Sequence, residues 1–273
     1  MVKRSLFGLF GKKPRTNVWI IDGVSSSSRG IRDGAATFRA LDIIYNSEAG
    51  VGSNRLVRWI DWFWLHVRNA QAVRNRLEIV RSELCTAIEE HAHREQPVRI
   101  LVIAAGSGQA DIEAIVKMRV KGIAVEALLV DISRSALAHA RKLATIHGVM
   151  DSVRVQILSV INKDGKVADF DQKIGDFNPH IVEMAGLIDY LLNEQIVALF
   201  RKIYSLLPKG GHLVTCHIHP NQESFCLLYA VNWWMRYRTR DKLTALLAEG
   251  GFSHLKLITE PHGMHTVAVG RKP

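Results

Sequence analysis

The sequence predicts an α/β fold: a doubly wound, mostly parallel, seven-stranded sheet with a C-terminal antiparallel hairpin, preceded by an N-terminal helical region. Three observations predict it. After Pro97, apolar runs rich in β-branched residues alternate with amphipathic helical segments, the order that builds parallel sheets. These runs contain few alternating polar positions, as expected when helices cover both sheet faces. The last two runs flank a turn at 261–263, which indicates a hairpin.

The composition predicts a folded chain whose cysteines remain free thiols. With 273 residues and 48% hydrophobic content, the chain can bury a full core. Cys85, Cys216 and Cys226 lie far apart and form no CxxC pair, so neither a disulfide framework nor a zinc knuckle is indicated. We therefore expect no metal site and a cytoplasmic location. The sequence does not indicate an oligomeric state.

We expect three parts: a basic, disordered tail over 1–15, a helical region or lid over 16–96, and the doubly wound domain over 97–273. The tail carries +5 of the formal net charge of +10, from Lys3, Arg4, Lys12, Lys13 and Arg15. Its alternative role is contact with an anionic membrane surface through Phe7, Leu9 and Phe10, which makes the protein peripheral to the membrane. No apolar run reaches the roughly 18 to 20 residues of a transmembrane segment.

The region 16–96 is predicted to be helical after a short VWIID run and a polar SSSSRG stretch. One helix carries Phe38, Leu41, Ile44 and Tyr45 at helical spacing. A longer helical region runs from Asn54 to about His91 and is broken near Asn69. Its second half places an apolar stripe on one face, formed by Val73, Leu77, Val80, Leu84 and Ile88. The charged residues predicted outside that stripe are Arg74, Arg76, Glu78 and Arg81.

In the domain 97–273, five parallel strands are expected in the runs RILVIA, AVEALLV, VRVQIL, HIVEM and GHLVTCHI, and the hairpin in GFSHLKLITE and MHTVAVGRK. The first strand ends at Ala104 in a tight glycine-rich turn. A helix follows, so the amides of Ser107–Gln109 are expected to face outward at its positive end. Gly106 and Gly108 allow a ligand to approach the backbone closely. Asp111 replaces the third glycine of the dinucleotide fingerprint, which disfavours NAD and FAD.

An acidic residue, Asp131, ends the second strand and suits a ribose. It lies 23 residues after Gly108 (131 − 108). Its carboxylate can accept hydrogen bonds from both hydroxyls of an adenosine ribose. The alternative is that Asp131 only caps the helix that begins at Ser133.

The motifs AAGSGQ, VDISRSALAHARKLATIHGV, PHIVEMAGLIDYL and LLPKGGHLVTCHI follow one another in this order. Together they resemble the class I S-adenosylmethionine-dependent methyltransferases, over residues 97–273. NAQAVRNRL, EMAGLIDYL and MRYRTRDKL are also similar to segments of a bacterial group of methyltransferases of unassigned substrate. The resemblance implies a Rossmann-like domain, S-adenosyl-L-methionine as cofactor and methyl transfer as the reaction.

The resemblance also implies a cofactor site. Gly106 and Gly108 would line the methionine side, Asp131 would hold the ribose, and Ile132 would pack on the adenine. Ser159 stands near the point where many family members have an aspartate at the adenine edge. The residues implied in cofactor binding are Ala105, Gly106, Ser107, Gly108, Asp131, Ile132, Ser159, Val160, Glu183, Met184 and Ala185. Glu183, Met184 and Ala185 would lie beside the sulfonium, with core packing as the alternative for Met184.

Methyl transfer requires alignment of donor and acceptor, and a base only if the acceptor loses a proton. The residues predicted as catalytic are Glu183, Tyr190 and His217, at the carboxyl ends of strands where ligands of such sheets bind. Asp189 and His219 are further candidates. Tyr45, Asn69, Arg74 or Arg76 could lie near the cofactor in a lid, and surface solvation is the alternative for these arginines.

The predicted acceptor is a small or lipid-like molecule, because the apolar segment 224–243 could line a cavity for it. The alternative is that its aromatic residues pack into the core. Cys216 lies in a TC pair like that of RNA cytosine methyltransferases, but no Pro-Cys element follows the fourth strand, so nucleic acid is disfavoured. RNA methylation, transfer of the aminopropyl or aminobutyryl group, and a cofactor-binding module without catalysis are kept as alternatives.

Overall fold

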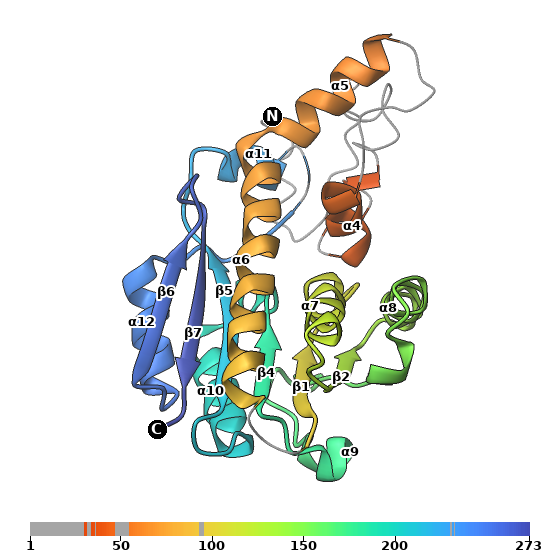
Figure 1. Ribbon diagram of the computed structural model, residues 1–273. Helices are drawn as coiled ribbons and strands as arrows, with labels where there is room; N and C mark the ends of the chain where they lie inside the picture. Colours follow the sequence, from red (N-terminus) through yellow and green to blue (C-terminus); the bar gives the residue numbers. More distant parts are fainter. Residues whose placement is uncertain are drawn as a thin grey trace. The chain divides into compact units, whose positions relative to one another are not determined.

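A computed structural model describes residues 30–31, 34–35, 37–46, 55–92, 96–229, 231 and 233–273. They form two compact units (Figure 1). The smaller contains the residues up to Asn75 together with Pro220–Met235, and the larger contains Arg76–His219 and Arg236–Pro273. The sequence predicts a boundary at 96 and 97 instead, and that boundary stays a prediction. The predictions for the tail and for the VWIID and SSSSRG segments lie outside the described residues.

The larger unit contains a seven-stranded sheet in the order β3-β2-β1-β4-β5-β7-β6. The first five strands along the chain pair in parallel, whereas β7 pairs antiparallel with β5 and β6. This confirms the predicted sheet and its hairpin. The bounds are β1 Val98–Ile103, β2 Val125–Asp131, β3 Val153–Ile157, β4 Ile181–Met184, β5 His212–Ile218, β6 His254–Thr259 and β7 His265–Arg271.

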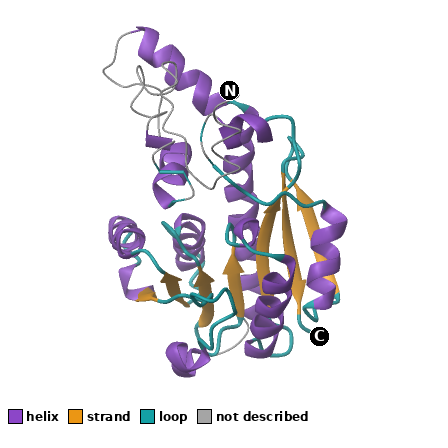
Figure 2. Cartoon of the chain, turned by 180° about the vertical axis from the view of Figure 1, so that it is seen from behind, coloured by secondary structure: helices purple, strands orange, loops and turns teal. Residues whose placement is uncertain are grey.

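Helices cover both faces of this sheet (Figure 2). On one face, α7 and α8 pack with the later turns of α6. On the other face, α10 and α12 pack with the short α9. Apolar cores therefore lie on both sides, as the strands' continuous hydrophobicity predicts. The bounds are α6 Arg68–His91, α7 Gln109–Val120, α8 Arg134–Ile146, α9 Asp171–Ile174, α10 Asn193–Leu206 and α12 Arg240–Glu249, with 3-10 turns η1 Met150–Ser152, η2 Gly175–Phe177 and η3 Ile188–Tyr190.

The smaller unit is helical, with α4 Phe38–Asn46, α5 Arg55–His66, the first turns of α6 and α11 Ser224–Tyr229. The predicted break near Asn69 is confirmed, because α5 ends at His66 and α6 begins at Arg68. The Glu223 carboxylate caps α6 by accepting the amides of Arg68 (3.3 Å) and Asn69 (3.0 Å). Trp233 is buried in this unit's core, which favours the packing alternative for that residue.

Within the described part of the chain, no helix combines the length and the apolar composition that crossing a membrane requires.

Candidate functional site

The turn after β1 has an unusual backbone. Ala104, Gly106 and Gly108 all have positive φ angles, of 54°, 57° and 61°. For the non-glycine Ala104 this conformation costs about 1 kcal/mol, and such strain concentrates at functional sites. The positive φ of Gly108 favours glycine, and a β-carbon there would also lie 2.6 Å from Leu129 Cδ2, so that the Leu129 side chain would have to move. The sequence therefore encodes a close turn at the carboxyl end of β1.

One expectation for this turn is wrong. The Gly108 amide does not face outward, because it donates to the Ala105 carbonyl oxygen at 2.8 Å. Ser107 is buried as well. The Gly108 amide thus stabilises the turn itself, and α7 begins at the next residue, Gln109.

Asp131 connects this turn to the end of β2. Its Oδ2 accepts the Gly106 amide at 2.9 Å, and its Oδ1 accepts the Ser133 amide at 2.8 Å. The helix cap is Ser133 itself, whose hydroxyl accepts the Ala136 amide at 3.2 Å. Each carboxylate oxygen has two lone pairs, so each can accept one further hydrogen bond. Asp131 is therefore held in place by the backbone and still able to bind two hydroxyl groups.

The residues predicted to lie beside the adenine differ in their exposure. Ile132, next to Asp131, is 72% exposed, which is high for an isoleucine in a folded domain. Val160 is buried, and the Ser159 hydroxyl donates to the Ile161 carbonyl at 2.5 Å. Ile132 thus offers apolar surface for a planar ring, whereas Ser159 and Val160 shape the loop after β3. Their roles in cofactor binding stay predictions.

The end of β4 contributes the remaining predicted residues. Glu183 pairs with Val102 across the strands β4 and β1, and Ala185 follows at the strand end. The Met184 side chain is fully buried in the core beneath α10, so it agrees with the packing alternative. Its carbonyl accepts the Thr215 hydroxyl at 2.8 Å. Of these three residues, Glu183 has the side chain with chemistry to offer a ligand.

Glu183 and Asp111 are two buried acids that interact through their charges, and they are called the carboxylate pair below. In the sequence, Asp111 stands out only as the replacement for a glycine of the dinucleotide fingerprint. Asp111 lies in the first turn of α7. Burial raises the pKa of Asp111 to about 7. Burial, and then the charge of Asp111, raise the pKa of Glu183, although the Ala185 amide and the Arg76 guanidinium act against the shift. Burial therefore disfavours the ionised form of both acids.

Asp111 Oδ1 is buried and has no hydrogen-bond partner among the residues that the structure describes. Buried polar atoms are normally satisfied, because an unsatisfied one costs about 1 to 3 kcal/mol. An unsatisfied carboxylate oxygen near a second acid is suited to a cationic group, which would favour the ionised form of both acids.

Arg76 corrects a second expectation. It is buried, whereas the sequence reasoning placed it outside the apolar stripe and favoured surface solvation. It lies three residues after Val73 and four before Val80, which is helical spacing on one face. Its guanidinium donates to the Cys216 sulfur and lies near Glu183. The position of Arg76 was thus readable from the periodicity.

Cys216 is a buried strand residue, as expected. Burial raises the pKa of its thiol to about 12, even though the Arg76 charge acts in the opposite direction. The thiol is therefore protonated at neutral pH and is a poor nucleophile. This counts against the cysteine-dependent chemistry of the RNA cytosine enzymes.

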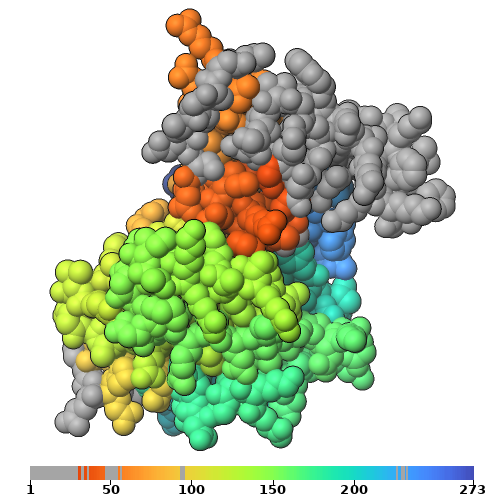
Figure 3. Space-filling model, turned by 90° about the vertical axis from the view of Figure 1, so that its right-hand side faces the viewer, coloured from red at the N-terminus to blue at the C-terminus, as the bar shows by residue number. Residues whose placement is uncertain are grey.

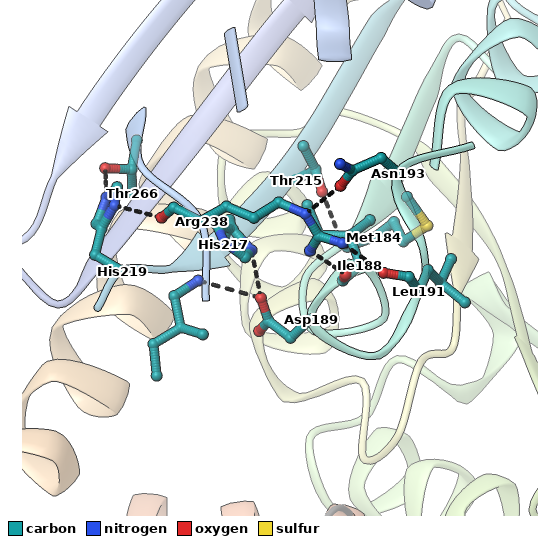
Figure 4. Close-up of polar contacts among 11 residues, drawn as sticks. Met184, Ile188, Asp189, Leu191, Asn193, Thr215, His217, His219, Arg238 and Thr266 are labelled. Atoms are coloured by element: carbon teal, nitrogen blue, oxygen red, sulfur yellow. Dashed lines mark hydrogen bonds and ion pairs between the residues drawn. The ribbon is translucent and has the colours of Figure 1, made fainter. Parts of the chain in front are cut away.

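A second polar cluster lies at the ends of β4 and β5 (Figure 4). His217 Nδ1 is 2.6 Å from Asp189 Oδ1, which also accepts the Ile218 amide at 3.1 Å. Burial would raise the pKa of Asp189, but the hydrogen bond and charge of His217 outweigh it and lower that pKa. Both side chains are buried. An acceptor would reach His217 only after the surrounding chain moves, and its catalytic role stays a prediction.

Arg238 and His219 extend this cluster. The Arg238 guanidinium donates to the carbonyl oxygens of Ile188 (3.0 Å) and Leu191 and to Asn193 Oδ1 (2.8 Å). One His219 ring nitrogen is 3.0 Å from the Arg238 carbonyl and the other is 2.6 Å from the Thr266 hydroxyl. The cluster thus fixes the loop after β4, in which Tyr190 is half-buried. The catalytic roles predicted for Tyr190 and Glu183 stay predictions.

Arg74 and Asn69, suggested as lid residues, have structural partners within the smaller unit. Arg74 donates to the carbonyl oxygens of Ile44 (3.2 Å) and Leu65 (2.6 Å). The Asn69 amide side chain donates to Glu223 Oε2 at 2.7 Å. Both residues therefore hold helices of this unit together.

Comparisons with known proteins agree with this architecture. A family model described as "Putative methyltransferase" matches residues 2–272. The uncharacterized protein YnbC of Escherichia coli (strain K12) is 22% identical over 248 residues, which are 88% of this chain and 41% of that protein. The chain thus spans about two fifths of the length of this curated relative.

Solved structures show a similar fold. One is a possible exported protein from Bordetella parapertussis, with a TM-score of 0.68, 16% identity, and coverage of 99% of this chain and 93% of that chain. Another is the S-adenosylmethionine-dependent methyltransferase SibL in its apo form, with a TM-score of 0.52, 15% identity, and coverage of 100% of this chain and 74% of that chain. At these identities the likeness concerns the fold alone.

Proposed function

The chain belongs to the methyltransferase family whose model spans residues 2–272, and from that premise we propose that it transfers a methyl group from S-adenosyl-L-methionine. One observation carries the proposal. Asp131, anchored by the Gly106 amide, ends β2 beside the close turn that follows β1, and the neighbouring elements α7 and β4 supply the buried acids Asp111 and Glu183. These groups suit the two ends of an adenosyl sulfonium compound.

The residues present fit that cofactor. Asp131 has an acceptor site left on each oxygen for the two ribose hydroxyls. Ile132 offers exposed apolar surface for the adenine. The carboxylate pair, with the unsatisfied Asp111 Oδ1, suits the positively charged amino acid end. In NAD and FAD the adenosine ribose carries an anionic pyrophosphate, which two buried carboxylates would repel, so the pair favours the sulfonium compound over a dinucleotide.

The chain's own contribution is binding and alignment. The cofactor supplies an activated methyl group, so the protein has to orient the donor and acceptor and to exclude water. The strained turn and Asp131 fix the nucleoside, and the buried carboxylates give up their proton when a cation arrives. Glu183, a member of this pair, is the predicted base for acceptors that must lose a proton.

For the acceptor we propose a small or lipid-like molecule. The protonated, buried Cys216 argues against the cysteine-dependent route to methylated cytosine. Phe225 and Trp234 of the smaller unit are about half exposed, which leaves apolar surface in the segment 224–243. Such side chains suit an acceptor with a hydrocarbon part better than a nucleobase read through hydrogen bonds.

Product analysis tests the reaction. Incubation of the purified chain with S-adenosyl-L-methionine and fractionated cell extract should give S-adenosylhomocysteine together with a methylated small or lipid-soluble product. Methylthioadenosine would instead indicate transfer of the aminopropyl or aminobutyryl group. Cofactor binding without either product would favour a binding module, and methylated RNA would overturn the proposed acceptor class.

A further inference from the structure

Helix α5 exposes aromatic side chains on one face. Trp59, Trp62 and Phe63 are 63%, 50% and 45% exposed. The Trp59 and Phe63 rings stack with centroids 6.2 Å apart, and those of Trp62 and His66 stack at 4.6 Å. Large aromatic side chains gathered on a surface mark interaction sites. In the space-filling view, atoms of this orange-coloured part of the chain lie on the surface (Figure 3).

The same face is basic. Arg55, Arg58 and His66 are exposed, and with the three aromatic residues they occupy an arc of about 140° at 3.6 residues per turn. The helix contains one acidic residue, Asp61, and this residue is buried. Ile60 and Leu65 are also buried, so α5 attaches to its unit through the other side.

This combination identifies the chemistry of the partner. Aromatic rings flanked by arginines are suited to the headgroup region of a bilayer, where rings enter the acyl boundary and guanidinium groups bind phosphates. A purely apolar partner would leave the arginines without counter-charges. Half of the chain's net charge of +10 lies in its first fifteen residues, which adds long-range attraction to an anionic surface.

We propose that the exposed face of α5 binds the surface of anionic phospholipid membranes, with Trp59, Trp62 and Phe63 inserted between the headgroups and Arg55 and Arg58 on the phosphates. This binding does not depend on the cofactor or on methyl transfer. Its failure would therefore leave the proposed reaction standing, and the reverse also holds.

Vesicle sedimentation of the full chain without cofactor tests the proposal. We expect retention on vesicles of phosphatidylglycerol and phosphatidylcholine, little retention on phosphatidylcholine alone, and a blue shift of tryptophan emission on binding. The variant W59S/W62S/F63S should lose at least about tenfold in the partition coefficient. R55Q/R58Q should lose roughly thirtyfold, at about fivefold per arginine.

Three comparisons make the result specific to α5. V120S/I146S removes exposed apolar side chains from the larger unit and should bind vesicles like the unmodified chain. W59F/W62F keeps the apolar face and should retain binding while most of the emission shift disappears. Deletion of residues 1–15 should lower retention and leave the emission shift in place.

Absence of binding to anionic vesicles would overturn the proposal. Equal retention of W59S/W62S/F63S, with unchanged circular dichroism and melting temperature, would overturn it as well. A concentration-dependent dimer that this variant loses, without vesicle binding, would instead assign the face to a second copy of the chain.

Discussion

Two buried acids of the larger unit, Asp189 and Asp111, differ in how completely their carboxylate oxygens are satisfied. Around Asp189, the carboxylate, His217 Nδ1 and the Arg238 guanidinium all have close partners, although His217 Nε2 has none among the described residues. At Asp111, one buried carboxylate oxygen has no hydrogen-bond partner among the described residues, and Asp111 interacts through its charge with a second buried acid, Glu183. The contacts of Asp189 hold loops in place. The unsatisfied oxygen of Asp111 destabilises the fold, and a cationic ligand can remove that destabilisation.

The two acids should therefore respond to pH in opposite directions. The pKa of Asp189 is lowered in the folded state, so its pairing stabilises the fold above its unfolded value of about 4 and is lost as pH falls through the folded pKa. The pKa of Asp111 is raised to about 7, so ionisation of Asp111 reduces stability as pH rises from about 4 to 7. Stability rises with pH where the folded protein favours the ionised carboxylate, as at Asp189, and falls with pH where it favours the neutral form, as at Asp111.

The largest expected effect is at Asp189. Asp189→Ala should lower the free energy of unfolding by about 3 to 5 kcal/mol, because it leaves buried polar groups of His217 and the Ile218 amide without a partner. Urea denaturation at pH 7 measures this. Glu249→Ala removes an exposed partner of Arg201 and should cost under about 0.5 kcal/mol. Similar losses of stability for both variants would show that the buried Asp189 contributes no more than an exposed acid does.

Asp111→Asn should affect cofactor binding rather than stability. We expect unchanged or higher stability at pH 7, because the substitution removes a buried acid, together with roughly thirtyfold weaker binding of S-adenosyl-L-methionine, about 2 kcal/mol for a lost charge-assisted contact. Calorimetry and denaturation of the same preparation provide both values. A large loss of stability with intact affinity would make the pair structural.

Asp131→Ala should weaken cofactor binding at least about tenfold, equivalent to 1.4 kcal/mol or more. The loss is expected because Asp131 both anchors the turn at Gly106 and offers acceptors to the ribose. Asp176→Ala, an exposed acid in η2, is the matched control and should bind normally. An unchanged affinity of the Asp131 variant would remove the ribose assignment.

The smallest expected effect is the release of a proton from the carboxylate pair when the cofactor binds. A bound cation lowers the pKa of the pair, so binding near pH 7 should release up to about one proton, and affinity should rise with pH up to about 7. Titration calorimetry in two buffers with different ionisation enthalpies measures the release. Asp111→Asn should reduce it, and proton uptake on binding would contradict the model.

Much of the fold could be predicted because its signals are local. The parallel strands, the hairpin, the break before Asn69 and the turn at Gly106 follow from hydrophobic runs and glycine spacing. The position of Arg76 also follows from helical spacing, although it was assigned to the wrong side. Helical spacing also places Asp111 on the buried face of α7, because it lies three, four and seven residues before Ala114, Ile115 and Met118. Its interaction with Glu183 could not be found this way, because Glu183 lies in a strand far along the chain.

The sequence by itself thus determined the strand order along the chain, the glycine turn and the acid that ends β2, since each depends on residues close to one another. Tertiary structure alone decided that Asp111 meets Glu183 and that Asp189 meets His217. Those pairs come from different elements, and only the crossovers and the register of β1, β4 and β5 bring them together. Burial then sets their pKa values, because the dielectric surroundings of a carboxylate depend on the whole packed unit.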